Sequence, residues 1–327
     1  RGREMGHPEH GYDIMNRFRK ENKSVIFISH DLDEIMEVCD TLTVLRDGKI
    51  IRTFEKAEFE AGAIRASMIG RELQGDYYRS DFQASSQPEV ALDVRNLVYE
   101  DRLKGISFQV HKGEIVGIGG LAHCGMHSLG KVCFGALKPE EGSVTVEDGT
   151  IIDSPAIAMK KRVGYVSKDR DVESLCLNAS IEDNISIAGM SEFAINNFLI
   201  LKNREKKYVN HQIEELSIKC AGRDQSVSQL SGGNKQKVVF GKWIGCGSEI
   251  LILDCPTRGV DIGVKQAMYQ LMVRLKNEGK SILMISEELP ELIGMSDRIL
   301  IMKNGEVSAE FERSETLSDA QIIEYMI

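Results

Sequence analysis

Two neighbouring segments of the sequence constrain the fold more than any other feature. Residues 230–237 read LSGGNKQK, which predicts a turn that opens a helix and presents free backbone N–H groups to a phosphate. Residues 249–254 read EILILD, which predicts a buried parallel strand that delivers its terminal carboxylate to a magnesium ion. Together they indicate an α/β domain that binds a phosphorylated ligand.

The same two segments resemble the signature motif and the Walker B strand of ABC transporter ATPases. The resemblance continues through residues 254–263, DCPTRGVDIG, and covers roughly residues 90–327. The combined motif is similar to the second nucleotide-binding domain of tandem ATPases that energise monosaccharide import, of the ribose, galactoside and xylose type. This implies a P-loop NTPase-like ABC ATPase fold with a parallel-sheet core, an antiparallel β-subdomain and an inserted helical subdomain.

The resemblance also implies ligands, partners and a location. The ligands are ATP and Mg²⁺. The partners are transmembrane permease subunits of a sugar importer and another ATPase domain paired head to tail. The location is the cytoplasm, peripheral on the inner face of the plasma membrane through the permease. The residues implied are the metal ligand Asp254 and the signature residues Leu230, Ser231, Gly232, Gly233 and Gln236.

Charge, cysteines and apolar runs fit such a protein. The net charge of −9 argues against general nucleic-acid binding. The seven cysteines are scattered without a CxxC pair, which is typical of reduced thiols in a cytoplasm. The apolar runs have the length of strands, far below the ~18 residues that cross a bilayer.

Apolar periodicity supports the expected architecture. Residues 91–98 and 106–110 alternate like half-buried strands, and with residues 143–147 they would form the antiparallel subdomain. Residues 180–220 read mainly as helices. The predicted strands of the parallel sheet are 114–118, 162–167, 249–254, 281–286 and 298–303.

An internal repeat organises the chain. Residues 24–34, SVIFISHDLDE, resemble residues 281–291, SILMISEELPE. His30 and Glu287 are 257 positions apart, as are Asp40 and Asp297. A constant offset across a strand–helix–strand unit indicates a duplicated domain.

The repeat predicts the domain boundaries. Residues 1–57 are expected to be the C-terminal part of a first ABC ATPase domain, although the first ten or so match nothing. The alternative is an unrelated accessory unit. Residues 58–89 read as a linker, with a helical patch at 63–73 before a polar stretch. Residues 90–327 are expected to be a complete second domain with a degenerate nucleotide site.

The expected phosphate loop has lost two of its usual groups. Gly120 and Gly125 preserve a G-x-x-x-x-G frame, whose backbone N–H groups would bind an anion. Met126 replaces the lysine that reaches the phosphates, and His127 replaces the hydroxyl that holds Mg²⁺. These losses predict a weak or absent nucleotide site, and the alternative is that the glycines remain only to pack a helix on a strand. The nucleotide-binding candidates are Gly120, Cys124, Gly125, Met126, His127 and Ser128.

Two further replacements remove hydrolytic groups. Cys255 stands where the family carries a catalytic glutamate, and Glu287 stands at the switch histidine. A thiol is a poor base for water, and a carboxylate would repel a γ-phosphate. His30 matches the switch histidine of the first domain. The chain's own site is therefore expected not to hydrolyse ATP, while Ser231 and its glycines could complete a partner's site.

Two alternatives stay open. One is a zinc site, since His123, Cys124 and His127 cluster in the loop and Asp254 and Cys255 would lie nearby. The other is a non-catalytic or decayed nucleotide-binding module without transport activity.

Overall fold

The structure, a computed structural model, describes residue 15 and residues 17–29, 32–46, 49–69, 77–82, 84–195 and 199–327. It forms two compact units. One comprises the chain up to residue 76 with residues 261–263, and the other comprises residues 77–260 and 264–327. Within the described residues, no helix has both the length and the apolar character needed to cross a bilayer.

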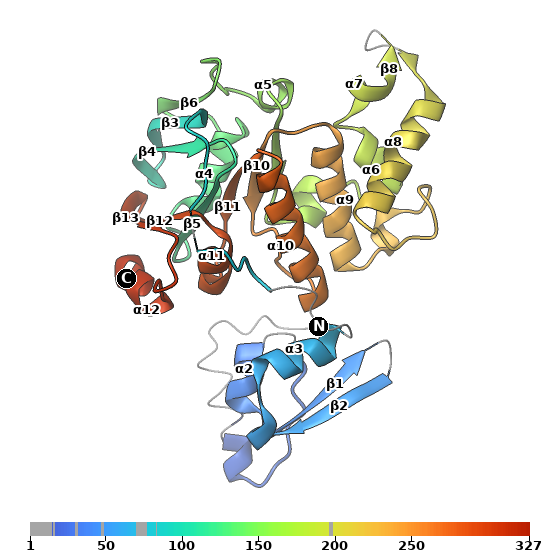
Figure 1. Ribbon diagram of the computed structural model, residues 1–327, viewed down its shortest axis with the longest axis vertical. Helices are drawn as coiled ribbons and strands as arrows, with labels where there is room; N and C mark the ends of the chain where they lie inside the picture. Colours follow the sequence, from blue (N-terminus) through green and yellow to red (C-terminus); the bar gives the residue numbers. More distant parts are fainter. Residues whose placement is uncertain are drawn as a thin grey trace. The chain divides into compact units, whose positions relative to one another are not determined.

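The second unit is built on a six-stranded sheet in the order β13-β12-β5-β11-β10-β7 (Figure 1). Five strands run parallel, and β13 pairs antiparallel with β12 at one edge. The strands are β5 (Ile115–Gly120), β7 (Val163–Val166), β10 (Ile250–Asp254), β11 (Ser281–Ile285), β12 (Arg298–Lys303) and β13 (Glu306–Glu312). The five predicted strands are all present, and β13 is an addition.

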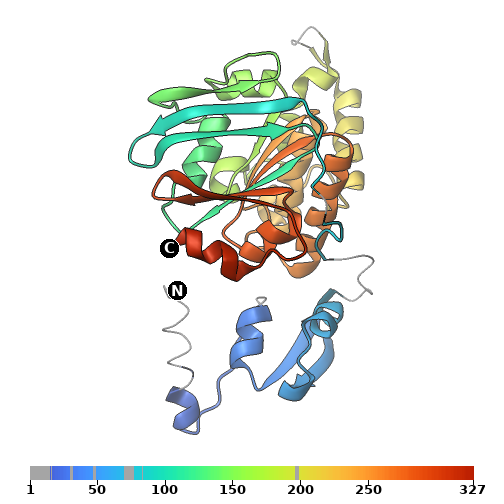
Figure 2. The same ribbon diagram turned by 60° about the vertical axis from the view of Figure 1, so that its left-hand side comes forward.

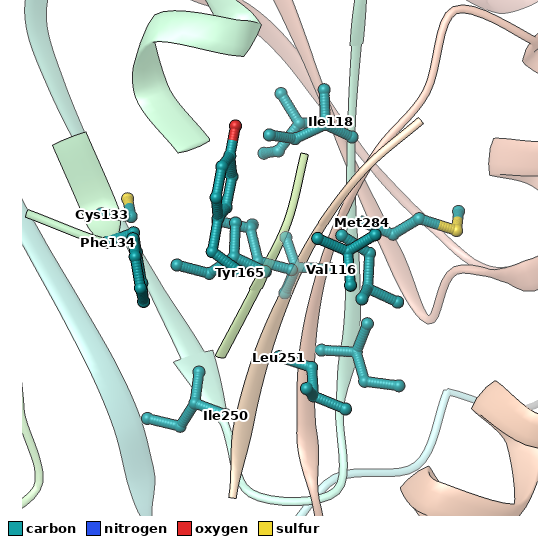
Figure 3. Close-up of a cluster of buried hydrophobic side chains, with 14 of the residues drawn as sticks. Val116, Ile118, Cys133, Phe134, Tyr165, Ile250, Leu251 and Met284 are labelled. Carbon is teal, nitrogen blue, oxygen red and sulfur yellow. The ribbon is translucent and has the colours of Figure 1, made fainter. Parts of the chain in front are cut away.

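The parallel strands are apolar because both faces of the sheet are covered. All residues of β5, β7, β10 and β11 are buried, as expected for a sheet with helices on each side. Figure 3 shows Val116, Ile118, Leu251 and Met284 packed in this core. The ring of Tyr165 joins them, with its hydroxyl oxygen pointing away from Val116 and Leu251.

Helices cover the two faces. Helix α4 (Met126–Cys133) lies on one face, where a Cβ on Gly130 would come within 2.6 Å of Ile285. Helix α11 (Leu289–Met295) lies on the other, where a Cβ on Gly117 would come within 2.2 Å of the Ser296 hydroxyl. The remaining helices around this sheet are α5 (Pro155–Lys160), α9 (Gly232–Gly245), α10 (Ile262–Asn277) and α12 (Asp319–Met326).

Two further layers complete this unit. The antiparallel sheet β4-β3-β6 contains β3 (Val90–Tyr99), β4 (Leu103–His111) and β6 (Glu141–Val146), and its long strands stand out in Figure 2. The helical region contains α6 (Ile181–Ser186), α7 (Met190–Phe193) and α8 (Lys202–Glu215), with a small hairpin of β8 (Ala194–Ile195) and β9 (Leu199–Ile200). The sequence predicted both layers except for the hairpin. Short turns of helix occur at η2 (Arg170–Ser174) and η3 (Val227–Gln229).

The first unit reproduces the end of the second, element by element. It contains α2 (Leu32–Val38), β1 (Thr41–Arg46), β2 (Lys49–Glu55), η1 (Lys56–Glu58) and α3 (Ala61–Ile69). The bounds of α2, β1 and β2 match those of α11, β12 and β13 at the offset of 257 positions. Both hairpins also carry an irregularity at equivalent places, Val44/Leu45 and Ile301/Met302. The structure therefore confirms the repeat.

Hydrogen bonds extend this correspondence upstream of the predicted repeat. Lys23 N donates to Phe18 O, as Lys280 N donates to Leu275 O at the same offset. The ion pair of Arg19 with Asp40 corresponds to that of Lys276 with Asp297. The repeat thus includes the end of a helix before residue 24.

One predicted element is wrong. The segment SVIFIS at 24–29 is not a strand, although its counterpart β11 lies between β5 and β10. Ile26 and Ile28 are each 91% exposed. A strand needs hydrogen-bonded neighbours, and among the described residues no strand pairs with this segment.

The second compact unit begins inside the predicted linker. Arg79 is buried, and its guanidinium donates to the Asp297 carboxylate at 2.9 Å and to the Met295 carbonyl at 3.1 Å. The Tyr78 ring packs against that of Tyr269, with centroids 5.2 Å apart. Residues from Tyr77 onward are thus tied to the second unit, while residues 70–76 lie outside the described part of the chain.

Candidate functional site

The candidate phosphate loop connects β5 to α4, where the sequence places it. Gly125 precedes α4 with φ of 103°, a conformation that favours glycine. A Cβ there would lie 2.1 Å from the Arg102 carbonyl oxygen, and one on Gly120 would lie 2.4 Å from the Met302 carbonyl oxygen. Both glycines are therefore required by packing, whether or not the loop binds a phosphate.

Three of the candidate side chains in and after the loop are buried. Met126 is 1% exposed and belongs to the apolar core. Cys124 is also buried, and burial raises the pKa of its thiol. Ser128 is buried, with its hydroxyl 3.5 Å from an Arg102 nitrogen. None of these three side chains offers a cation to an anion in the loop.

The His127 ring is hydrogen-bonded to the Asp254 carboxylate at the end of β10. Its Nδ1 lies 2.7 Å from Asp254 Oδ1, and the Tyr165 hydroxyl donates to Asp254 Oδ2 at 3.2 Å. Asp254 is 1% exposed. The imidazole therefore occupies one oxygen of this buried carboxylate.

Lys168 and Glu287 close the network on the other side of the ring. The Lys168 ammonium lies 3.1 Å from His127 Nε2 and donates to Glu287 Oε1 at 2.6 Å. Burial of Glu287 opposes ionisation, but the hydrogen bond and charge of Lys168 outweigh it and hold its pKa below the usual range. The predicted repulsion from Glu287 is thus offset in this structure by a neighbouring cation.

The ring tautomer follows from these contacts. An ammonium group can only donate, so Lys168 makes His127 Nε2 an acceptor and leaves the proton on Nδ1. Nδ1 then donates to Asp254. This chain of bonds satisfies all four charged or polar groups without a bound ion.

Cys255 follows β10 in a strained conformation. Its φ of 49° lies in the left-handed region, which costs a residue with a Cβ about 1 kcal/mol. Its backbone N–H donates to the Ile285 carbonyl at 2.8 Å. Burial, followed by the Asp254 and Glu287 carboxylates, raises the pKa of its thiol. The neutral thiol is therefore a poor general base for water.

The donor set does not fit Mg²⁺. This ion prefers oxygen ligands in near-octahedral geometry. Here the groups that converge are an imidazole nitrogen, a carboxylate oxygen and a thiol sulfur, from His127, Asp254 and Cys255. Only one of the three is a hard oxygen donor. Of the zinc ligands considered from sequence, these three lie together, while His123 and Cys124 are outside the group.

The signature segment keeps an accessible turn. Ser231 is exposed and caps α9, and its hydroxyl accepts from the Asn234 side chain at 2.9 Å. Leu230 and Gly233 are buried, and a Cβ on Gly233 would lie 2.7 Å from Val264. Gln236 is 1% exposed and lies under the first turn of the helix.

Arg170 ties this turn to the segment after β10. Its guanidinium donates to the Arg258 carbonyl at 2.7 Å and to the Gly259 carbonyl at 3.3 Å. A Cβ on Gly232 would lie 3.0 Å from the same guanidinium. Glycine at 232 therefore allows the close approach that holds the turn.

Sequence reasoning missed two members of the site. Tyr165 lies inside a predicted strand, and its bond to Asp254 spans residues distant in the sequence. The bond from Lys168 to Glu287 joins residues 119 positions apart, which no local pattern predicts. A tyrosine near the end of a buried apolar strand is the one signal in the sequence that could have identified Tyr165. His30 lies outside the described residues.

The ABC transporter family profile matches residues 103–258, which run from β4 through the loop, the signature and β10. Residues 103–258 belong to the ABC transporter family. The expected fold class is confirmed by solved structures of ATP-binding cassettes.

One such structure is a nucleotide-free ATP-binding cassette from an ABC transporter. It has a TM-score of 0.60 and 24% identity, and covers 73% of this chain and 99% of its own. Another is cbiO1 from Clostridium perfringens, part of the ABC transporter complex cbiONQ. It has a TM-score of 0.59 and 26% identity, and covers 72% of this chain and 94% of its own.

Curated relatives align over nearly all of this chain. The ribose import ATP-binding protein RbsA of Clostridium tetani (strain Massachusetts / E88) is 37% identical over 317 residues, which are 97% of this chain. The protein of the same name from Streptococcus agalactiae serotype III (strain NEM316) is 39% identical over 308 residues, which are 94% of this chain. The chain spans 62% of the length of each relative.

Proposed function

We propose that this chain is the ATP-binding subunit of a monosaccharide importer and couples ATP binding and hydrolysis to transport. The observation that carries the proposal is its similarity to proteins named for ribose import over nearly the whole chain. Its partners are permease subunits in the membrane. It associates through them with the inner face of the plasma membrane, on the cytoplasmic side.

The chain's own nucleotide site does not hydrolyse ATP in this proposal. Met126 supplies no cation, His127 takes the place of a hydroxyl, and Cys255 supplies no carboxylate. The bonds among His127, Asp254, Lys168 and Glu287 support this reading, because a nucleotide would have to displace them. The same network favours the second candidate, a nucleotide-binding module without catalysis or transport.

Hydrolysis takes place in a site shared with another ATPase domain. Domains of this family pair head to tail, so that the signature of one faces the phosphate loop of the other. Ser231 is exposed at the start of α9, where its hydroxyl and the helix N-terminus suit a γ-phosphate. The chain thus contributes the signature to a site whose phosphate loop belongs to the partner domain.

This division of labour predicts a large effect for one substitution and a small effect for another. In an assembly with permease subunits and a domain that carries an intact phosphate loop, Ser231→Ala is expected to lower ATP hydrolysis about 10-fold or more. The reason is the loss of a hydrogen bond to a charged group, which contributes about 1.5–3 kcal/mol. Asp254→Ala is expected to change the rate less than about twofold, since no phosphate is processed beside it.

Steady-state phosphate release measures both effects, with sugar uptake into proteoliposomes as the second readout. If Asp254→Ala stops ATP hydrolysis, the proposal that the chain's own site is inactive is refuted. Hydrolysis that no permease pair stimulates, with no uptake, would favour the second candidate.

We further propose that residues 1–57 are the C-terminal part of a first ABC ATPase domain. The 257-residue offset that relates α2, β1 and β2 to α11, β12 and β13 supports this. So does the exposure of Ile26 and Ile28, whose counterparts Leu283 and Ile285 are buried in the sheet. The segment has the sequence of a central strand and lacks neighbouring strands in this structure.

Hydrogen exchange gives this proposal an internal control. Amides of residues 25–28 are expected to exchange at rates close to those of an unstructured chain. Their counterparts in β11 are expected to exchange at least about a thousandfold more slowly, because core strands open only with much of the domain. Equal protection of both segments in this chain would show that 24–28 is already paired, and would contradict the proposal.

A further inference from the structure

We propose that the former magnesium position of this domain is a site for a softer divalent metal, of the Zn²⁺ class. The ligands are His127, Asp254 and Cys255, which each offer one ligand atom within 4.8 Å of the other two. The nearest ring and carboxylate atoms are His127 Nδ1 and Asp254 Oδ1. Nitrogen, oxygen and sulfur donors in one small group are typical of Zn²⁺ and unsuited to Mg²⁺. His127 in place of a magnesium-binding hydroxyl, and Cys255 in place of a catalytic glutamate, therefore create a different site.

The ligands are held by rigid elements. Asp254 ends β10 and Cys255 follows it, fixed by the bond from its backbone to Ile285 on β11. His127 lies in the first turn of α4, which packs on the same strands. Asp254 is 1% exposed and Cys255 is 7% exposed. Sites on helices and strands hold a metal more rigidly than sites on loops.

The movement that metal binding requires of the His127 ring is small. His127 Nδ1 and Asp254 Oδ1 are now 2.7 Å apart, as a hydrogen bond requires. Two ligands about 2.0–2.1 Å from a tetrahedral zinc lie about 3.3–3.4 Å apart. The imidazole would therefore have to retreat by less than about 1 Å along the direction of that bond.

The other side of the ring provides the supporting carboxylate. Glu287 Oε1 lies 3.4 Å from His127 Nε2, and a metal-bound histidine usually donates its second N–H to such a group. When the metal takes Nδ1, the proton moves to Nε2 and that nitrogen donates to Glu287. Lys168 then keeps its bond to Glu287 at 2.6 Å and no longer needs the ring as an acceptor.

The charges balance. A neutral imidazole, an Asp254 carboxylate and a Cys255 thiolate carry two negative charges, which a divalent ion neutralises in this buried place. The thiol proton leaves as the metal–sulfur bond forms, so binding releases a proton and is weaker at low pH. Three protein ligands leave a fourth position for a water molecule.

Cobalt titration tests the site without relying on activity. Metal-free chain titrated with Co²⁺ is expected to develop a near-ultraviolet charge-transfer band from a cysteine–cobalt bond, which Zn²⁺ removes and Mg²⁺ does not. Cys255→Ser is expected to abolish the band. His127→Ala and Glu287→Gln are each expected to weaken binding about 10-fold or more, the second through its effect on the ring.

Cys246→Ser is the matched control, since Cys246 is a partly buried thiol that bonds to Trp243 O outside the site. Trp243 fluorescence verifies that each variant is folded. A band that persists in Cys255→Ser, is lost equally in Cys246→Ser, or is absent from the native chain overturns the proposal.

Discussion

Replacing Met126 by lysine and His127 by threonine is expected to raise the affinity of the chain for Mg-ATP at least about 10-fold. The lysine restores a cation for the phosphates, and the threonine restores an oxygen ligand while releasing Asp254 from the imidazole. A hydrogen bond to a charged group contributes about 1.5–3 kcal/mol, or about 10- to 100-fold in binding. Isothermal titration calorimetry with ATP, with Mg²⁺ and with EDTA, measures the change.

A second pair of substitutions separates the effect of the new functional groups from the effect of side-chain volume. Met126→Leu with His127→Gln removes the imidazole and keeps the volume, but adds neither a cation nor a hydroxyl. This pair is expected to gain no Mg²⁺-dependent affinity. Because Met126 is buried, thermal unfolding by Trp243 fluorescence must show that both variants fold. Equal affinities of the two pairs would contradict the account of the loop.

The second large effect concerns stability. Asp297→Ala is expected to lower the free energy of unfolding of the second unit by about 3–5 kcal/mol, because it removes the carboxylate that pairs with two buried cations. The Asp297 carboxylate lies 2.9 Å from an Arg79 nitrogen and 3.2 Å from the Lys276 ammonium. It also accepts from the Ile115 backbone at 2.8 Å. Chemical denaturation followed by Trp243, the chain's single tryptophan, measures the loss.

The repeat supplies a matched control for this variant. Asp40 is the counterpart of Asp297, but its side chain is 77% exposed. Its ion pair with Arg19 is solvated, and such pairs contribute little. Asp40→Ala is expected to leave the Trp243 transition unchanged. A shift as large as that of Asp297→Ala would show that burial of the carboxylate is not the cause.

The central sheet could be predicted because its strands are uniformly apolar. β5, β10 and β11 are buried throughout, and such runs are specific for a covered parallel sheet. The edge strand β13 escaped prediction because its residues are mostly exposed. The segment 24–29 failed for the opposite reason: its sequence has the apolar pattern of a central strand, but a strand also needs neighbours.

The candidate site could likewise be predicted only in part from the sequence. The losses at Met126, His127 and Cys255 are local substitutions in recognisable motifs, so the sequence alone identifies them. The bond between Lys168 and Glu287 joins the segments that follow β7 and β11. Which groups meet there depends on the register of β7, β10 and β11, and no local pattern specifies that register across a long separation.

The most direct test of the central claim is the effect of Mg²⁺ on ATP binding by the native chain. Calorimetric titration of metal-free protein with ATP is expected to give an affinity in excess Mg²⁺ that is no higher than the affinity in EDTA. The reason is that the His127 ring is hydrogen-bonded to Asp254 and that Cys255 offers no oxygen. An affinity that rises about 10-fold or more with Mg²⁺, and falls back in Asp254→Ala, would contradict it.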